Sequence, residues 1–240
     1  NYKTCKFSSK DLIKVKIDNP SLCSRYSCRV IKNVTVKESP KWLKDKLAII
    51  GQKSINNVVD IANYIMFDLG QPLHAFDYDK LNGNTIEVRQ ANNGEEILCL
   101  NNDLKKLSND DVVITDSKGP IAIAGVIGGF DSQVDFDTKN ILLESAVFDE
   151  ISVRRTSKKY DYAKEASKRF ERGVDFENTI YVLDKFTKLL VEITGGEASE
   201  DYIDVIAKSK DVKSIDFDFN KCNKFLGIDL DQDKYDELFK

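Results

Sequence analysis

The sequence predicts an α+β fold, a layered sandwich of mainly antiparallel strands with flanking helices. Residues 11–18 alternate apolar and polar side chains and residues 25–36 are rich in β-branched side chains, as in half-buried strands. Helical patterns follow, short strands fill the segment from Asn84 to Phe148, and helical patterns then return. Because no βαβ unit repeats, this grouping favours α+β layers over a parallel sheet.

A helix is predicted to begin at Ser39 and Pro40, because a hydroxyl cap followed by proline is a common helix start, and to end at Gly51. Short apolar runs separated by Gly, Asn and Ser then predict strands over 85–90, 97–100, 104–107, 111–115, 120–124 and 140–144. Further helices are predicted from residue 149 or 152 to 159, over 163–172 and from a cap at Asp175 to 194, with a strand over 201–206.

His74 is the only histidine in the chain. It follows a second predicted helix over 56–69, where Gly70 occupies a left-handed C-cap position and Pro72 cannot continue the helix. We therefore expect His74 in a short constrained loop after a buried helix. A lone histidine is more often structural than catalytic, so both roles stay open at this point.

Three segments are predicted along the chain. Residues 1–196 form the main module, residues 197–211 are a connector, and residues 212–240 are the truncated start of a following domain with a strand and two helices. Fewer than about 40 residues rarely fold alone. The chain starts at Asn1 without methionine and stops within a helical pattern, so we expect a piece of a longer protein.

Composition excludes several classes of protein. No apolar run approaches the ~20 residues of a membrane span. The five cysteines are scattered without CxxC spacing, and one histidine cannot complete a Cys/His zinc set, which indicates a reduced, cytoplasmic protein without a metal site. A net charge of −4 gives no overall nucleic-acid footprint, so any RNA contact must use a local basic patch.

Two apolar stretches are candidate pocket walls. Residues 120–129 combine small side chains with strand character, which indicates either tight sheet packing or a pocket floor with a bare backbone. Glu144 interrupts the apolar run 141–148, where it is either a charge at a strand end or a buried hydrogen-bond acceptor.

The most basic part of the chain lies between residues 154 and 172. Arg154, Arg155, Lys168 and Arg169 are its candidate contacts for a phosphate backbone, although a solvated, ion-paired helix face is the common alternative.

Five motifs occur in order along the chain. They are Ile55-Asn-Asn-Val-Val-Asp-Ile-Ala-Asn-Tyr64, Gly70-Gln-Pro-Leu-His-Ala-Phe-Asp77, Ile123-Ala-Gly-Val-Ile-Gly-Gly129, Leu142-Leu-Glu-Ser-Ala-Val-Phe148 and Ser167-Lys-Arg-Phe-Glu-Arg-Gly-Val-Asp175. Over roughly residues 15–196 they resemble the central module of the beta subunit of bacterial phenylalanyl-tRNA synthetase. Residues 212–240 resemble the opening of the next domain of that subunit.

The resemblance implies the fold of that editing module and its activity, hydrolysis of tyrosine wrongly esterified to phenylalanine tRNA. By matching position, Glu144 would read the tyrosine hydroxyl and His74 would position the attacking water. The matching substrate-binding positions are Pro72, Ala124, Gly125, Gly128, Lys164 and Ala166. A site that hydrogen-bonds a substrate hydroxyl rejects the analogue lacking it by ~10⁴–10⁵-fold.

The resemblance also implies partners. They are the acceptor end of phenylalanine tRNA and the alpha subunit of a heterotetramer. No cofactor is expected in this segment, because ATP and magnesium belong to the aminoacylation site elsewhere in such an enzyme.

The chain departs from the family at Lys164, where threonine is usual, in residues 159–163, and at Lys53-Ser54 in place of Arg-Pro. A lysine at 164 would crowd the pocket, pair with Glu144 or contact tRNA phosphate. The alternative function is therefore a non-catalytic structural and tRNA-orienting domain whose editing has decayed.

Overall fold

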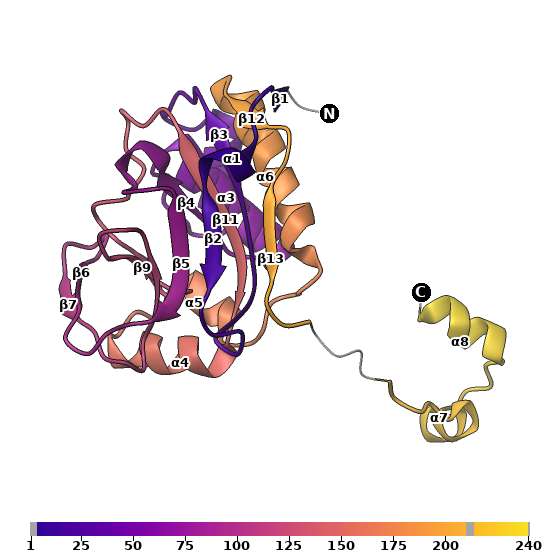
Figure 1. Cartoon of the computed structure of the whole chain (residues 1–240). Helices are drawn as coiled ribbons and strands as arrows, with labels where there is room; N and C mark the ends of the chain where they lie inside the picture. Colours follow the sequence, from indigo (N-terminus) through magenta and orange to yellow (C-terminus); the bar gives the residue numbers. More distant parts are fainter. Residues whose placement is uncertain (1–3, 210–213, 240) are drawn as a thin grey trace. The chain divides into compact units, whose positions relative to one another are not determined.

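The computed structural model describes residues 4–209 and 214–239 of the chain. Backbone contacts divide the chain into two units, Asn1–Ser209 and Lys210–Lys240. The first unit contains two large β-sheets and most of the helices (Figure 1). In the second unit, α7 (Phe219–Leu226) and α8 (Gln232–Leu238) pack Tyr235 between Phe217 and Phe219, with ring centroids 5.5 and 5.1 Å away.

The first sheet has six strands in the order β1-β12-β3-β11-β4, and β13 also pairs with β3. The bounds are β1 (Thr4–Cys5), β3 (Cys23–Lys32), β4 (Leu73–Asp77), β11 (Ile141–Phe148), β12 (Glu197–Ser199) and β13 (Ile203–Ile206).

The second sheet has five strands in the order β10-β9-β8-β5-β2. They are β2 (Lys14–Ile17), β5 (Thr85–Gln90), β8 (Val112–Thr115), β9 (Pro120–Ile123) and β10 (Ile127–Gly128), and a hairpin of β6 (Glu96–Leu98) and β7 (Leu104–Lys106) is separate. Among the described pairings only β1 with β12 and β2 with β5 are parallel, so the predicted mainly antiparallel α+β fold is confirmed.

Helices cover one face of the six-stranded sheet, with α3 (Asn57–Leu69) and α6 (Asn178–Thr194) beside β3 and β11 (Figure 1). Together with α2 (Lys41–Ile49), they bury apolar side chains against β3 and β11. The remaining helices are α1 (Ser9–Leu12), the 3₁₀ turn η1 (Tyr78–Lys80), α4 (Glu150–Lys159) and α5 (Glu165–Phe170).

The other face of the six-stranded sheet packs against the five-stranded sheet. Along β11, Ile141 and Leu143 join the core under the helices, whereas Leu142 and Ala146 join the core between the sheets. Because strand side chains alternate between faces, Glu144 lies on the face between the sheets. Burial on both faces explains the nearly continuous apolar run of β11.

The prediction of a loop at His74 is wrong. As predicted, α3 ends at Gly70, which has a left-handed backbone with φ of 75°. The chain then enters β4, which pairs antiparallel with β11 from Leu73↔Ser145 to Asp77↔Ile141. His74 is therefore held by a sheet, which fixes its direction more firmly than a loop would.

Two short strands lie within the predicted connector over 197–211. Residues 197–199 and 203–206 form β12 and β13, which pair with β3 inside the first unit, and β13 agrees with the strand predicted over 201–206. Strand β3 is ten residues long, and β11 covers one of its edges. The two short strands cover the other edge, which would otherwise be open to pairing with another chain. Residues 210–213 lie outside the described part of the chain.

Several boundaries differ from the prediction, three of them by an element that starts later or is absent. Residues 9–12 form α1, so the predicted strand at 11–18 begins only at Lys14. Helix α6 begins at Asn178, and Asp175 accepts a hydrogen bond from the Glu177 backbone N–H at 3.0 Å in the turn before it. Residues 214–218 form no strand, and α7 starts at Phe219.

Candidate functional site

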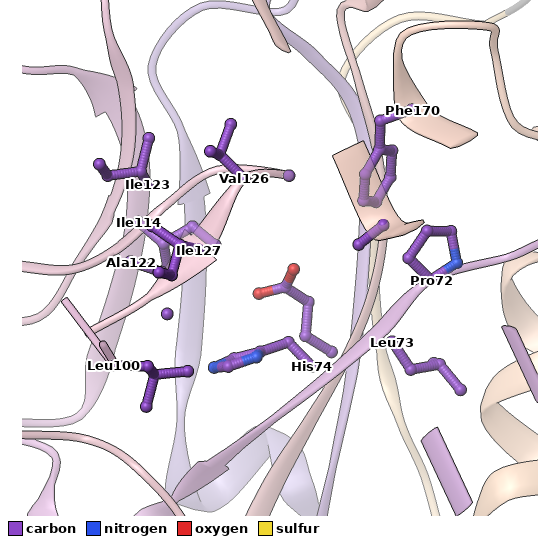
Figure 2. Close-up of a pocket in the computed structure, with 14 residues that line it drawn as sticks. Pro72, Leu73, His74, Leu100, Ile114, Ala122, Ile123, Val126, Ile127 and Phe170 are labelled. Atoms are coloured by element: carbon purple, nitrogen blue, oxygen red, sulfur yellow. The ribbon is translucent and has the colours of Figure 1, made fainter. Parts of the chain in front are cut away.

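A pocket of about 210 Å³ lies where β4 and β11 face the five-stranded sheet. Its lining is mostly apolar and comes from β4, β8, β9, β10, β11 and α5, from the residue before β4, and from the loops after β6 and β9. Figure 2 shows His74 with its ring directed towards Leu100, between Pro72 and Phe170 on one side and Ala122, Ile123, Val126 and Ile127 on the other. Glu144, Gly125, Gly128 and Ala166 also line it. A cavity of about 150 Å³ can bind benzene, so this pocket has room for a phenol ring.

Glu144 and His74 are cross-strand partners. They are paired in the register of β11 with β4, so their side chains are neighbours on the same face of the sheet. The His74 ring also packs edge-on against Phe76, with 4.4 Å between ring centroids. The two polar side chains of the lining therefore lie together in an apolar pocket.

Glu144 is 5 % exposed. Its Oε2 accepts a hydrogen bond of 2.9 Å from the hydroxyl of Tyr26 on β3. Burial raises the pKa of Glu144 to about 8, and the bond from Tyr26 opposes that rise. At neutral pH the carboxyl is therefore mostly protonated when the pocket is empty.

Burial lowers the pKa of His74 to about 4, so its ring is neutral at physiological pH. Its Nε2 is buried and has no hydrogen-bond partner among the described residues. A buried polar atom without a partner is costly. In this pocket a water molecule or a ligand would relieve that cost.

The chain before His74 is firmly anchored. Gln71 is buried, and its Nε2 donates a hydrogen bond of 2.9 Å to the carbonyl oxygen of Ala146 on β11. Pro72 follows and lines the pocket. These contacts fix the register in which β4 pairs with β11, and so they fix the position of His74 opposite Glu144.

Two glycines are required at the pocket wall. A Cβ atom at Gly128 would lie 2.6 Å from Cε1 of His74. Gly125 has φ of 68°, and a Cβ there would lie 2.9 Å from Cγ2 of Val153 and 3.1 Å from Cδ2 of Phe170. Gly128 therefore leaves room for the imidazole, and Gly125 leaves room for side chains of α4 and α5.

The structure brings together six of the predicted site residues in this pocket: His74, Glu144, Pro72, Gly125, Gly128 and Ala166. Ala124 is buried but outside the lining, and its backbone N–H donates to Val112 at 2.9 Å. Lys164 is exposed at the start of α5 and is also outside the lining. The expectation that a lysine at 164 crowds the pocket or pairs with Glu144 is therefore not met.

The four candidate phosphate contacts lie on α4 and α5, where three are exposed and Arg169 is half-buried against the ring of Phe67. Arg154 is exposed, and Arg155 donates to the Asp110 carbonyl at 2.7 Å. Lys168 and Arg169 pair with Glu165 at 2.8 and 2.9 Å. None of the four lines the pocket, although α5 contributes Ala166 and Phe170 to it.

Sequence reasoning missed Tyr26 and Leu100. Tyr26 is fully buried in β3, where nothing local distinguishes it from an ordinary core aromatic. Leu100 follows β6 and reaches the pocket because its backbone N–H donates to Gly128 at 3.0 Å. Both roles depend on pairings between segments distant in sequence.

Within residues 4–209 and 214–239, no group of three or more His, Cys, Asp or Glu side chains is placed to hold a metal ion. The helices of the described part of the chain are all too short or too polar to cross a membrane.

Three comparisons place the chain among known proteins. Residues 22–195 match the family model of the B3/4 domain. The chain is 44% identical over 227 residues to the phenylalanine–tRNA ligase beta subunit of Dehalococcoides mccartyi, covering 95% of the chain and 28% of the relative. It is 42% identical over 233 residues to that of Fusobacterium nucleatum, covering 97% and 29%. The chain thus spans less than a third of the length of these relatives.

A crystal structure of an N-terminal fragment of the phenylalanyl-tRNA synthetase beta subunit from Pyrococcus horikoshii has a similar fold. The TM-score is 0.54 at 14% identity, covering all of this chain and 65% of that one. At this identity the likeness concerns the fold. Since the B3/4 model matches well over half of its residues, the chain belongs to the B3/4 domain family.

Proposed function

We propose that this chain is the editing module of a phenylalanine–tRNA ligase beta subunit, and that its pocket hydrolyses tyrosine wrongly esterified to phenylalanine tRNA. The observation that carries the proposal is the pairing of Glu144 with His74 inside an apolar pocket with room for a phenol ring. The similarity to phenylalanine–tRNA ligase beta subunits supports the choice of amino acid and tRNA.

Recognition would rest on Glu144. A tyrosine ring lying between the two sheets would place its hydroxyl at this carboxyl, whereas phenylalanine would leave the carboxyl oxygen that Tyr26 does not bond without a partner. Sites built to hydrogen-bond a hydroxyl reject the analogue lacking it by ~10⁴–10⁵-fold. An apolar pocket of the same shape would discriminate far less.

Hydrolysis would rest on His74. With its pKa near 4, the neutral ring accepts a hydrogen bond from a water molecule through Nε2, the atom without a partner in the described structure. Such a ring is a weak proton acceptor, so its role is to orient the water. An aminoacyl ester is already activated, and correct placement of the water supplies much of the rate.

The tRNA acceptor end would reach the pocket along α5, whose last turn carries Lys168 and Arg169. Phosphate contacts from Arg154 and Arg155 on α4 would extend this path. In the assembled enzyme an alpha subunit would carry out aminoacylation with ATP and magnesium, away from this module.

Filling the pocket tests the proposal. Ala166→Phe places a ring in the lining and is expected to reduce hydrolysis of Tyr-tRNA(Phe) by about tenfold or more, because tyrosine and the new ring cannot both fit. Hydrolysis is measured with the assembled enzyme. Ala163→Phe, at an exposed position outside the lining, is the matched control. Equal hydrolysis by the two variants would contradict a role for this pocket.

Lys164→Thr tests the alternative of a module whose editing has decayed. Because Lys164 is exposed and outside the lining, threonine there is expected to change hydrolysis of Tyr-tRNA(Phe) by less than about twofold, as for most surface substitutions. The same assay of tyrosine release provides the measurement. A large gain in hydrolysis would favour the alternative.

A further inference from the structure

Tyr26 is a buried polar residue behind the pocket. It is 0% exposed on β3, and its hydroxyl donates to Oε2 of Glu144 at 2.9 Å. Tyr26 pairs with Ala146 in the register of β3 with β11, so it lies diagonally across from Glu144 on the same sheet face. The Tyr26 hydroxyl therefore contacts the Glu144 carboxyl from within the protein core, outside the pocket lining.

The carboxyl of Glu144 is held at one oxygen only. Among the described residues Tyr26 is its sole hydrogen-bond partner, and Glu144 itself lines the pocket. Oε1 is therefore the oxygen left for a ligand. A side chain fixed in this way is pre-organised, which saves the ordering cost when a ligand binds.

The bond from Tyr26 also determines where the proton of Glu144 resides. When the carboxyl is neutral, Oε2 accepts from Tyr26 and the proton occupies Oε1, so Oε1 donates to the oxygen of a ligand hydroxyl. When the carboxyl is ionised, Oε1 accepts from the same hydroxyl. Both forms of Glu144 therefore present Oε1 to a group that donates and accepts, as a phenol does.

We propose that Tyr26 is a positioning residue for specificity, which anchors Oε2 of Glu144 so that Oε1 reads the hydroxyl of the bound amino acid. This inference rests on the proposed function. It extends the recognition element from one residue to a buried pair on neighbouring strands.

Few titratable groups face Glu144. On β3 they are Tyr26, Cys23 and Cys28, and on β4 there is His74. The pocket lining from the five-stranded sheet and α5 is apolar. Burial raises the pKa of both cysteines and of Tyr26 far above neutrality, and His74 titrates near 4. Only Glu144 in this group titrates near pH 8.

Tyr26→Phe tests the inference in the assembled enzyme. Removing the hydroxyl is expected to lower the ratio of kcat/KM for Tyr-tRNA(Phe) to that for Phe-tRNA(Phe) by about tenfold, the usual effect of losing one hydrogen bond to a charged or polarised group. Because the bond lowers the pKa of Glu144, the pH profile of kcat/KM is also expected to move to higher pH. A merely structural role would leave that profile in place.

Tyr78→Phe is the matched control, because Tyr78 packs on the same core and donates one hydrogen bond, to the Leu12 carbonyl at 3.2 Å. A fall in the ratio with a displaced profile in Tyr26→Phe, and neither in Tyr78→Phe, supports the inference. If the wild type hydrolyses Tyr-tRNA(Phe) and both variants keep its ratio and profile, the inference is overturned while the proposed function stands. If the wild type does not hydrolyse Tyr-tRNA(Phe), both are overturned.

Discussion

Replacing Glu144 with glutamine is expected to stabilise the 240-residue chain progressively as pH rises, by on the order of 4 kcal/mol relative to the wild type above about pH 8. Burial raises the pKa of Glu144 from its ordinary value of 4.5 to about 8. Between these values the folded chain retains a proton that the unfolded chain has lost. Stability of the wild type therefore falls with rising pH across this window, by ~1.4 kcal/mol per pH unit.

Glutamine removes this dependence because an amide of nearly the same shape does not ionise. It can still accept the hydrogen bond from Tyr26, so the buried hydroxyl keeps a partner. The difference between variant and wild type is therefore expected to be small near pH 4.5 and to grow until the carboxyl is fully ionised in the folded protein.

His74 acts in the opposite direction. Its pKa falls from 6.5 to about 4, so the folded chain holds fewer protons than the unfolded chain between those values. Its contribution is present above pH 6.5 and is lost as pH falls through 4. In the wild type the two effects on stability partly cancel in mildly acidic solution. The difference between Glu144→Gln and wild type therefore isolates Glu144 better than the pH dependence of the wild type alone.

Denaturant titrations of both proteins from about pH 5 to about pH 9 measure this difference. Glu200→Gln is the control, because Glu200 is exposed at the surface. A difference between Glu144→Gln and wild type that does not change with pH would contradict a buried, protonated Glu144.

Those elements of the site that depend only on local sequence could be predicted. The apolar run around Glu144 predicted a strand, which extends to Phe148, and Gly70 ends α3 as its sequence indicates. These features depend on side-chain periodicity and on the left-handed backbone that glycine permits.

The rest depends on pairing between distant segments. Strand β4 has no β-branched residue, and it becomes a strand because β11 offers it an open edge. The partnership of Tyr26 with Glu144 depends on the register between β3 and β11. Lys164 was expected in the pocket from its position in a motif, but it is exposed. Its direction depends on how the start of α5 is oriented, which the motif does not reveal.

Replacing Gly128 with alanine is expected to reduce hydrolysis of Tyr-tRNA(Phe) by about 10²-fold, since displacing a catalytic group by ~1 Å has effects of that size. A Cβ at this position would lie 2.6 Å from Cε1 and 2.9 Å from Nε2 of His74, and 3.1 Å from Cδ1 of Leu100. The imidazole must therefore move. Gly128 is not among the glycines with positive φ, so alanine adds no left-handed strain to the backbone.

The side chains around Gly128 leave the imidazole little choice of direction. Phe76 packs against the ring at 4.4 Å between centroids, and Cδ1 of Leu100 lies 3.1 Å from the added methyl group. Displacement thus moves Nε2 away from the position where it would hold a water molecule. Tyrosine recognition by Glu144 is expected to persist, so the loss should appear in kcat more than in KM.

Gly195→Ala separates this effect from a general loss of stability. Gly195 has φ of 74° with no atom within 4 Å of a built Cβ, so alanine there strains the backbone at the end of α6, away from the pocket lining. We expect Gly195→Ala to lower the unfolding midpoint and to retain hydrolysis below its own midpoint. If the two variants lose activity in proportion to their loss of stability, His74 is not the group that Gly128 positions for the reaction.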